Sequence, residues 1–267
     1  MKITILSNRD LASCVALNHL LPGLVDHEVN VFLSSRVGGS TEQAKELQDL
    51  KFYEQDLFLN TVFPIADALD LTEPQLRSFD SLARKFDLEI TILNKINGEE
   101  AQRFQSSEPD LVLSIRYGMI LKEAAIALPK YGVLNLHSGK LPDYKGVIAS
   151  FRAMLNGDKE LASTLHYIDD SSIDTGKVIG ISCLPMDSSK SYLWHVLALY
   201  EDGCRLMLEN VLKIGGGEEI KCLPQEASGN YFSFPEQQDL ERFREKGLRL
   251  FDSNELVEIA KRFYRSD

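Results

Sequence analysis

The predicted fold is organised around one stretch of the chain, Val133-Leu134-Asn135-Leu136-His137-Ser138-Gly139-Lys140-Leu141-Pro142. Apolar residues lead into an amide and an imidazole that stand two positions apart, at Asn135 and His137. In a strand, side chains at i and i+2 point to the same side. If residues 133–137 form a strand, both side chains enter one cleft at its carboxyl end. Such a pair can hold a carbonyl oxygen and shuttle a proton, so we treat it as a candidate catalytic centre.

Strand and helix patterns alternate on both sides of this stretch. Strand patterns cover residues 2–6, 28–33, 89–93, 109–115, 163–168 and 177–183, and helix patterns cover 11–20, 41–50, 73–85, 98–105, 122–128, 148–156 and 191–212. The nearly continuous apolar run at 109–115 is typical of a strand covered on both faces. The alternation predicts an α/β fold with a Rossmann-like, mostly parallel sheet and helices on both faces. Ser7 or Asp10 is expected to cap the first helix. The turn there lacks GxGxxG, so no NAD site is expected.

Glycines and an unusual apolar segment suggest the domain organisation. Gly215-Gly216-Gly217 ends the long helix pattern, which divides the chain into a catalytic domain at 1–214 and a carboxyl-terminal extension at 215–267. The catalytic domain carries an insertion at about 41–75, preceded by a polar turn through Gly38-Gly39-Ser40. Residues 51–71 are too apolar for a free loop, so they are expected to pack on the body or on a second subunit. The extension is expected to wrap the body or to support a homodimer.

The overall charge and hydropathy exclude several classes of protein. The formal net charge of −11 argues against a broad nucleic-acid footprint, which needs clustered Lys and Arg. No apolar run approaches the roughly 20 residues that span a bilayer. The amino terminus has a strand pattern instead of a signal-peptide pattern, so a cytoplasmic location is expected. Four scattered cysteines without ligand spacing predict reduced thiols and no metal site.

Four ordered motifs carry a resemblance to a known family. They are Tyr117-Gly118-Met119-Ile120-Leu121, Gly132-Val133-Leu134-Asn135-Leu136-His137, Leu141-Pro142-Asp143-Tyr144-Lys145-Gly146 and Ile173-Asp174-Thr175-Gly176. Together they resemble the formyltransferases that use 10-formyltetrahydrofolate. The resemblance covers about residues 109–179 and is weaker over 1–33. It implies the formyltransferase fold, 10-formyltetrahydrofolate as co-substrate, and a catalytic triad of Asn135, His137 and Asp174. The chain departs from its relatives in two places. The turn between His166 and Asp174 is one residue longer than in the nucleotide-biosynthesis members of the family, and Ser138-Gly139-Lys140 replaces the more usual Pro-Ser-Leu or Gly-Ser-Leu after the histidine.

The chemistry of formyl transfer suits these three residues. An amine attacks the formyl carbon, so the site needs oxyanion donors and a proton relay. Asn135 offers two N–H donors, His137 can carry a proton near neutral pH, and Asp174 can hold the ring and favour its protonated form. Alone, each has an ordinary structural explanation as a turn residue or a core histidine. Of the other histidines, only His166, which precedes the Asp174 loop, is a secondary candidate.

The resemblance also implies two binding slots. The co-substrate slot would be lined by Tyr117, Met119, Ile120, Leu121, Ile126, Val133, Ile168, Asp169 and Asp170. Backbone groups of residues 119–121 are suited to the pterin edge, and apolar side chains to its face. The acceptor slot is expected to involve Ser7, Asn8, Arg9 and Lys145, with Arg9 meeting a phosphate or a carboxylate.

The resulting expectation is an N-formyltransferase that acts on the amine of a small molecule, with a nucleotide-linked amino sugar as first candidate. A glycinamide ribonucleotide acceptor is disfavoured because the glycine-rich phosphate turn is missing. Two other members of the family are disfavoured. Methionyl-tRNA formyltransferases carry a larger carboxyl-terminal domain and a basic surface. Formyltetrahydrofolate hydrolases place a regulatory domain before the first strand. A hydrolase without that domain stays open, because the same triad can direct water at the formyl carbon. A non-catalytic folate-binding module is the alternative from another class.

Overall fold

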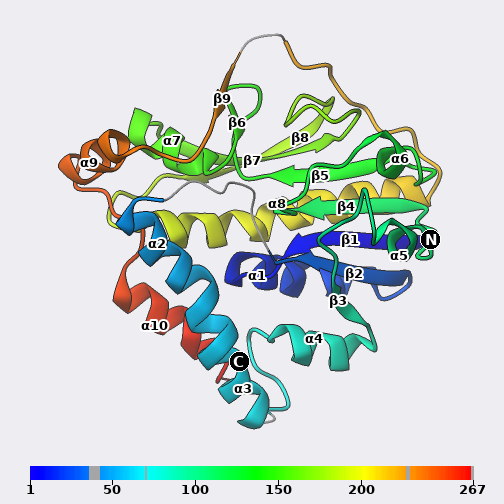
Figure 1. Cartoon of the computed structure of the whole chain (residues 1–267), viewed down its shortest axis with the longest axis horizontal. Coiled ribbons are helices and arrows are strands. Elements are labelled where there is room, and N and C mark those ends of the chain that lie inside the picture. Colours follow the sequence, from blue (N-terminus) through cyan, green and yellow to red (C-terminus); the bar gives the residue numbers. More distant parts are fainter. Residues whose placement is uncertain (36–42, 70, 227–228, 266–267) are drawn as a thin grey trace.

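The computed structural model describes residues 1–35, 43–69, 71–226 and 229–265, so the predicted turn at Gly38-Gly39-Ser40 lies outside the described residues. A seven-stranded sheet forms the centre (Figure 1). Its strands, in spatial order, are β3 (Ile90–Ile92), β2 (Glu28–Ser34), β1 (Lys2–Asn8), β4 (Leu111–Ile115), β5 (Val133–His137), β7 (Glu160–Tyr167) and β8 (Val178–Pro185). The first five are parallel, and β7 and β8 are antiparallel additions. The predicted mostly parallel α/β fold is confirmed.

The described helices lie around this sheet. They are α1 (Leu11–Leu20), α2 (Lys45–Lys51), α3 (Phe63–Leu69), α4 (Phe79–Phe86), α5 (Ala101–Gln105), α6 (Glu123–Ile126), α7 (Ala149–Asn156), α8 (Tyr192–Gly215), α9 (Gln237–Glu245) and α10 (Ser253–Lys261). A 3-10 turn, η1 (Leu21–Leu24), and two π-helical segments, η2 (Phe52–Asp56) and η3 (Phe58–Val62), complete the helical structure. None of the described helices is both long and apolar enough to cross a membrane.

Alternating strand residues divide the core between the two faces of the sheet. Leu134 and Leu136 belong to the large cluster that contains α1 and α8, whereas Val133 belongs to a smaller cluster with Phe104 of α5 and Ala125 of α6. This two-residue period is what a strand buried on both faces requires. The sheet order reverses between β1 and β4, whose neighbours lead in opposite directions. Open α/β sheets bind ligands at the carboxyl ends of their strands beside such a point.

The amino-terminal helix begins at the predicted cap, whereas the fourth helix is shorter than predicted. The Asp10 carboxylate accepts a hydrogen bond from the Ser13 N–H at 2.7 Å, which caps α1. The predicted helix at 73–85 begins only at Phe79. The residues before Phe79 do not extend this helix. The N–H groups of Gln75 and Leu76 instead donate to the backbone carbonyls of Arg265 and Arg262, at 2.9 Å each.

The insertion and the carboxyl-terminal extension pack against each other. The Phe263 ring lies 6.0 Å from the Phe58 ring and 5.0 Å from the Phe63 ring, and Tyr53 meets Phe251 at 4.4 Å between ring centroids. Tyr264 also donates its hydroxyl to a backbone carbonyl of η3. Figure 1 shows α10 beside the helical segment that runs from α2 to α3. Phe58, Val62 and Phe63 of this segment are therefore buried by residues of the same chain, whereas Phe52, Ile65 and Leu69 are exposed.

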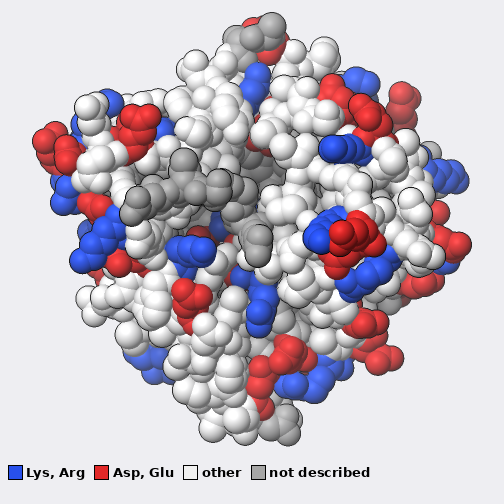
Figure 2. Space-filling model, viewed as in Figure 1, with Lys and Arg blue, Asp and Glu red and all other residues white. Residues whose placement is uncertain are grey.

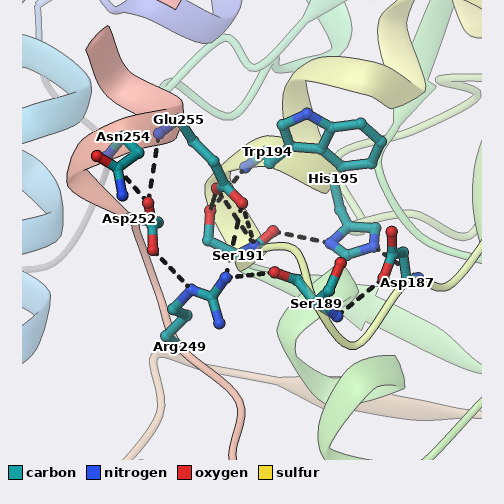
Figure 3. Close-up of polar contacts among 9 residues, drawn as sticks. All are labelled: Asp187, Ser189, Ser191, Trp194, His195, Arg249, Asp252, Asn254 and Glu255. Atoms are coloured by element: carbon teal, nitrogen blue, oxygen red, sulfur yellow. Dashed lines mark hydrogen bonds and ion pairs between the residues drawn. The ribbon is translucent and has the colours of Figure 1, made fainter. Parts of the chain in front are cut away.

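A polar network fastens the extension to the start of α8 (Figure 3). Ser191 caps α8 and donates its hydroxyl to the Glu255 carboxylate of α10 at 2.5 Å. Arg249 pairs with Asp252 at 3.1 Å, and it also donates to the backbone carbonyl of Ser189. These contacts join two segments about 60 residues apart in the chain. They fix where α10 lies on the catalytic domain.

A second, two-stranded sheet joins the extension to the loop that follows β5. It pairs β6 (Tyr144–Gly146) with β9 (Asn230–Phe232) in parallel. Gly146 has φ +95°, and a Cβ there would lie 2.2 Å from the Phe232 carbonyl oxygen, so only glycine allows this close approach. Neither three-residue strand was predicted, because such short pieces have no readable alternation.

Candidate active site

The predicted triad converges at the carboxyl end of β5. Asn135 and His137 point to the same side of the strand, and the Asp174 loop returns from β7 to meet them. The distance from His137 Nδ1 to Asp174 Oδ2 is 3.5 Å. A second imidazole, His166 of β7, stands directly opposite Asn135 in the antiparallel register. Four polar side chains from three segments therefore form one network.

Both ring nitrogens of His137 face protein groups. Nε2 lies 2.7 Å from the Tyr144 carbonyl oxygen. A carbonyl only accepts, so Nε2 carries a hydrogen and donates it. Nδ1 is then the nitrogen that faces the Asp174 carboxylate, and it is the one at which a proton can be gained or lost. The ring is only 9% exposed, so its orientation is fixed by these two contacts.

His166 completes the network and was only a secondary candidate from the sequence. Its Nδ1 donates to the Tyr167 carbonyl at 2.8 Å, and its Nε2 lies 3.0 Å from the Asn135 amide nitrogen and 3.6 Å from Asp174 Oδ1. One N–H of Asn135 is thereby directed at His166, which leaves the second N–H for a ligand. The antiparallel pairing of β5 with β7 brings His166 here, and no local sequence pattern signals that register.

Asp174 is a buried carboxylate held by several donors. Burial alone would raise the pKa of Asp174, but the facing His137 and His166 rings and the Gly146 N–H, at 2.8 Å, lower it to about 2. The residue has φ +55°, a left-handed conformation that is uncommon outside glycine. A charge fixed between two imidazoles in this way can orient both rings.

A second charged cluster lies at the same edge of the sheet, beyond β1 and β4. Arg116 donates from Nε to Asp10 at 3.1 Å and from Nη2 to Glu54 of η2 at 2.5 Å. Asp10 also accepts from the Asn8 amide at 2.8 Å. Burial raises the pKa of Glu54 to about 7, against the opposing pull of Arg116. The sequence did not reveal this cluster, because Arg116 and Glu54 are 62 residues apart.

The residues predicted for the co-substrate slot gather around the smaller core cluster. Leu121 and Val133 are buried members of it, and Tyr117, Met119, Ile126 and Ile168 are packed against it. Ile120 is instead 55% exposed, and its carbonyl accepts a hydrogen bond from the Asn97 amide at 2.7 Å. Asp169 and Asp170 are exposed beyond the end of β7. An apolar wall with exposed backbone beside it suits the flat pterin ring of a folate.

The residues predicted for the acceptor slot differ in exposure. Ser7 and Asn8 are buried, and their side chains bond to Ile115 and Asp10. Arg9 is exposed, and Lys145 lies on β6 with intermediate exposure. Of the four residues, Ser7 and Asn8 therefore shape the turn, whereas Arg9 and Lys145 are more exposed.

Figure 2 shows one face of the molecule that is hollowed near its centre, with charged side chains of both signs around the recess. A separate cavity of about 410 Å³ lies between α3 and α4 and contains none of the predicted residues. A cavity of about 230 Å³ lies between α5 and α6. Its lining includes Asn97 and Lys122, which adjoin the predicted co-substrate residues Ile120 and Leu121. Within the described residues, no group of three or more His, Cys, Asp or Glu is arranged to hold a metal ion.

Comparison with known proteins gives one family throughout. The model of the formyl transferase family matches residues 84–195, which include β4, β5, β7 and the Asp174 loop. A methionyl-tRNA formyltransferase from Kosmotoga olearia is 30% identical over 148 residues, or 55% of this chain and 47% of that protein. The chain spans about half the length of the curated relatives it matches.

Solved structures agree on the fold. An N-formyltransferase from Helicobacter canadensis, in complex with folinic acid and dTDP-3-aminofucose, aligns with a TM-score of 0.54 at 22% identity, over 90% of this chain and 72% of that one. A glycinamide ribonucleotide transformylase from Symbiobacterium toebii aligns with a TM-score of 0.55 at 15% identity, over 84% and 93%. At these identities the likeness concerns the fold alone.

Proposed function

We propose that this chain, whose residues 84–195 match the model of the formyl transferase family, is an N-formyltransferase. It moves the formyl group of 10-formyltetrahydrofolate to the amine of a small-molecule acceptor. One observation carries the proposal: Asn135, His137 and Asp174 meet at one strand end, with Asp174 3.5 Å from the His137 ring. They supply the oxyanion donor, the proton relay and the fixed charge that formyl transfer needs.

The co-substrate is assigned to the apolar wall at the carboxyl ends of β4 and β5. Tyr117, Met119, Ile126 and Ile168 cover the pterin face, with Leu121 and Val133 beneath them. Backbone groups of residues 119–121 face the pterin edge, although the Ile120 carbonyl already has Asn97 as one partner. Ile120, Asp169 and Asp170 complete the exposed rim. When bound, 10-formyltetrahydrofolate supplies the activated one-carbon unit.

The residues of the network have distinct tasks in this proposal. The N–H of Asn135 that is free of His166 donates to the formyl oxygen as negative charge develops there. His137 exchanges a proton at Nδ1, because Nε2 is committed to the Tyr144 carbonyl. Asp174, 3.5 Å from that nitrogen, holds the ring in its orientation. His166 holds Asn135 in place and is a positioning residue.

For the acceptor, we propose a nucleotide-linked amino sugar, with Arg9 and Lys145 toward its anionic groups. The net charge of −11 supports a small acceptor over a tRNA, whose phosphates need a broad basic surface. A methionyl-tRNA formyltransferase-like activity is the second candidate, because curated relatives that are similar along the sequence carry that name. Hydrolysis of 10-formyltetrahydrofolate is the third, since the same network can activate water.

One assay separates these activities. Purified protein is mixed with 10-formyltetrahydrofolate, and tetrahydrofolate release is followed without an amine, with nucleotide-linked amino sugars and with methionyl-tRNA. Release that depends on an amino sugar supports the proposal. Release with methionyl-tRNA only, or without any amine, replaces it with the second or third candidate. Binding without release contradicts all three.

A further inference from the structure

The segment that follows α8 returns to the candidate active site. Leu223 pairs with Val178 at the start of β8 through two backbone hydrogen bonds of 2.8 Å. Two residues later, the half-buried Gln225 places its amide nitrogen within hydrogen-bond distance of two carbonyls, at 2.9 Å from Asp174 O and 2.7 Å from Gly176 O. The two N–H groups of one carboxamide therefore hold the turn that carries the catalytic carboxylate.

The strand β9 holds the other side of the same carboxylate. It pairs with β6, and the Val147 N–H donates to the Phe232 carbonyl at 3.0 Å. The backbone of β6 supplies the Gly146 N–H that bonds the Asp174 carboxylate and the Tyr144 carbonyl that accepts from His137. The contacts that orient His137 and Asp174 thus come from a loop that the extension fastens.

From these contacts we propose that Gln225 is a positioning residue for the formyl-transfer network, and that the carboxyl-terminal extension is a working part of the active site. The proposal rests on the proposed function. Asp174 has φ +55°, a left-handed conformation that is strained for a residue other than glycine and needs surrounding bonds to persist. Gln225 supplies two such bonds to the turn. Its neutral amide can do this without disturbing the Asp174 charge, whereas a carboxylate there would face two carbonyl oxygens.

The test is Gln225→Met, which keeps the length of the side chain and removes both donors. Its matched control is Gln238→Met, on the exposed face of α9. We expect Gln225→Met to lower kcat about ten- to hundredfold, because small misplacements of catalytic groups have effects of that size. We expect the KM for 10-formyltetrahydrofolate and the melting temperature to stay near the wild-type values. Gln238→Met should match the wild type in all three.

A spectroscopic readout separates this proposal from the proposed function. Nitrogen-15 spectra of the imidazole rings, with His137 assigned by its loss in His137→Ala, report the ring contacts without any turnover. We expect the His137 signals to shift in Gln225→Met and to stay unchanged in Gln238→Met. If Gln225→Met does not fold, Gln225→Asn, one methylene shorter, takes its place.

The outcomes are distinct. Wild-type kcat in Gln225→Met overturns the positioning role. If the wild-type protein itself does not turn over 10-formyltetrahydrofolate, the proposed function fails, and the His137 signals then decide the positioning role alone. Unchanged signals in Gln225→Met overturn it in that case, and shifted signals support it.

Discussion

Two buried charged clusters lie at the carboxyl edge of the sheet, and they treat a carboxylate in opposite ways. Asp174 faces two imidazoles and a backbone N–H, and its pKa is lowered to about 2 against the effect of burial. Glu54 shares a single guanidinium, that of Arg116, with Asp10, and burial raises its pKa to about 7. The first cluster keeps Asp174 negatively charged at neutral pH, whereas the second leaves Glu54 partly protonated there.

The partners explain the different uses of the two clusters. Imidazoles gain and lose protons near neutral pH, so the network of Asn135, His137, His166 and Asp174 is suited to proton transfer. A guanidinium stays charged in proteins and relays no proton. The Arg116 cluster instead ties η2, from the insertion, to the ends of β1 and β4. We infer that it is structural, and that chemistry belongs to the Asp174 cluster alone.

The largest expected effect is on stability, from Arg116→Ala. Removing the guanidinium leaves Asp10 and Glu54 buried without their shared partner, and breaking a buried ion pair in this way costs about 3–5 kcal/mol. Urea unfolding at pH 7 measures the change in the free energy of unfolding. Adding Glu54→Gln should recover part of the loss, because it removes one of the two buried charges. A loss below about 1 kcal/mol in the single variant would contradict the structural role.

Glu54→Gln alone should change how stability depends on pH. A carboxyl group with a raised pKa in the folded state contributes stability that is complete below its unfolded value of 4.5 and is lost as the pH rises toward about 7. For the wild type, that loss is about 3 kcal/mol. The Gln variant lacks this titration. Its free energy of unfolding should therefore rise relative to that of the wild type as the pH increases from 4.5 to 7. Parallel curves would show that Glu54 is not buried as described.

Asp174→Asn should show the opposite sign at a lower pH. A lowered pKa gives stability that is present above the unfolded value of 3.8 and lost as the pH falls toward about 2. The wild type should therefore lose about 2 kcal/mol over this range that the Asn variant does not. Urea unfolding at steps from pH 5 to pH 2.5 measures the difference. A constant difference across these steps would mean that the two imidazoles do not stabilise the carboxylate.

Much of this arrangement could be predicted from the sequence. The apolar run before Asn135 defines β5 with its observed bounds, and the spacing of Asn135 and His137 places both at one strand end. The Asp174 turn follows from the polar run of residues 169–176, which ends in Gly176. These features depend on neighbouring residues, and local patterns are where sequence-based prediction is strongest.

The rest depends on contacts between distant segments. His166 joins the network only because β7 pairs with β5 in one antiparallel register. The bonds from Gln225 and β9 come from an extension that the sequence separates from the catalytic domain at Gly215. The Arg116 and Glu54 pair joins the end of β4 to η2 of the insertion, 62 residues earlier in the chain. No local pattern encodes these meetings.

The most direct test compares one variant from each cluster in the same turnover assay at pH 7.5. With the acceptor identified by tetrahydrofolate release, kcat is measured for His137→Ala and for Glu54→Gln. We predict that His137→Ala loses about a hundredfold or more, as for a general acid or base, whereas Glu54→Gln stays within about threefold of the wild type. Near-wild-type turnover in His137→Ala, with a large loss in Glu54→Gln, would place the chemistry in the other cluster and contradict the assignment.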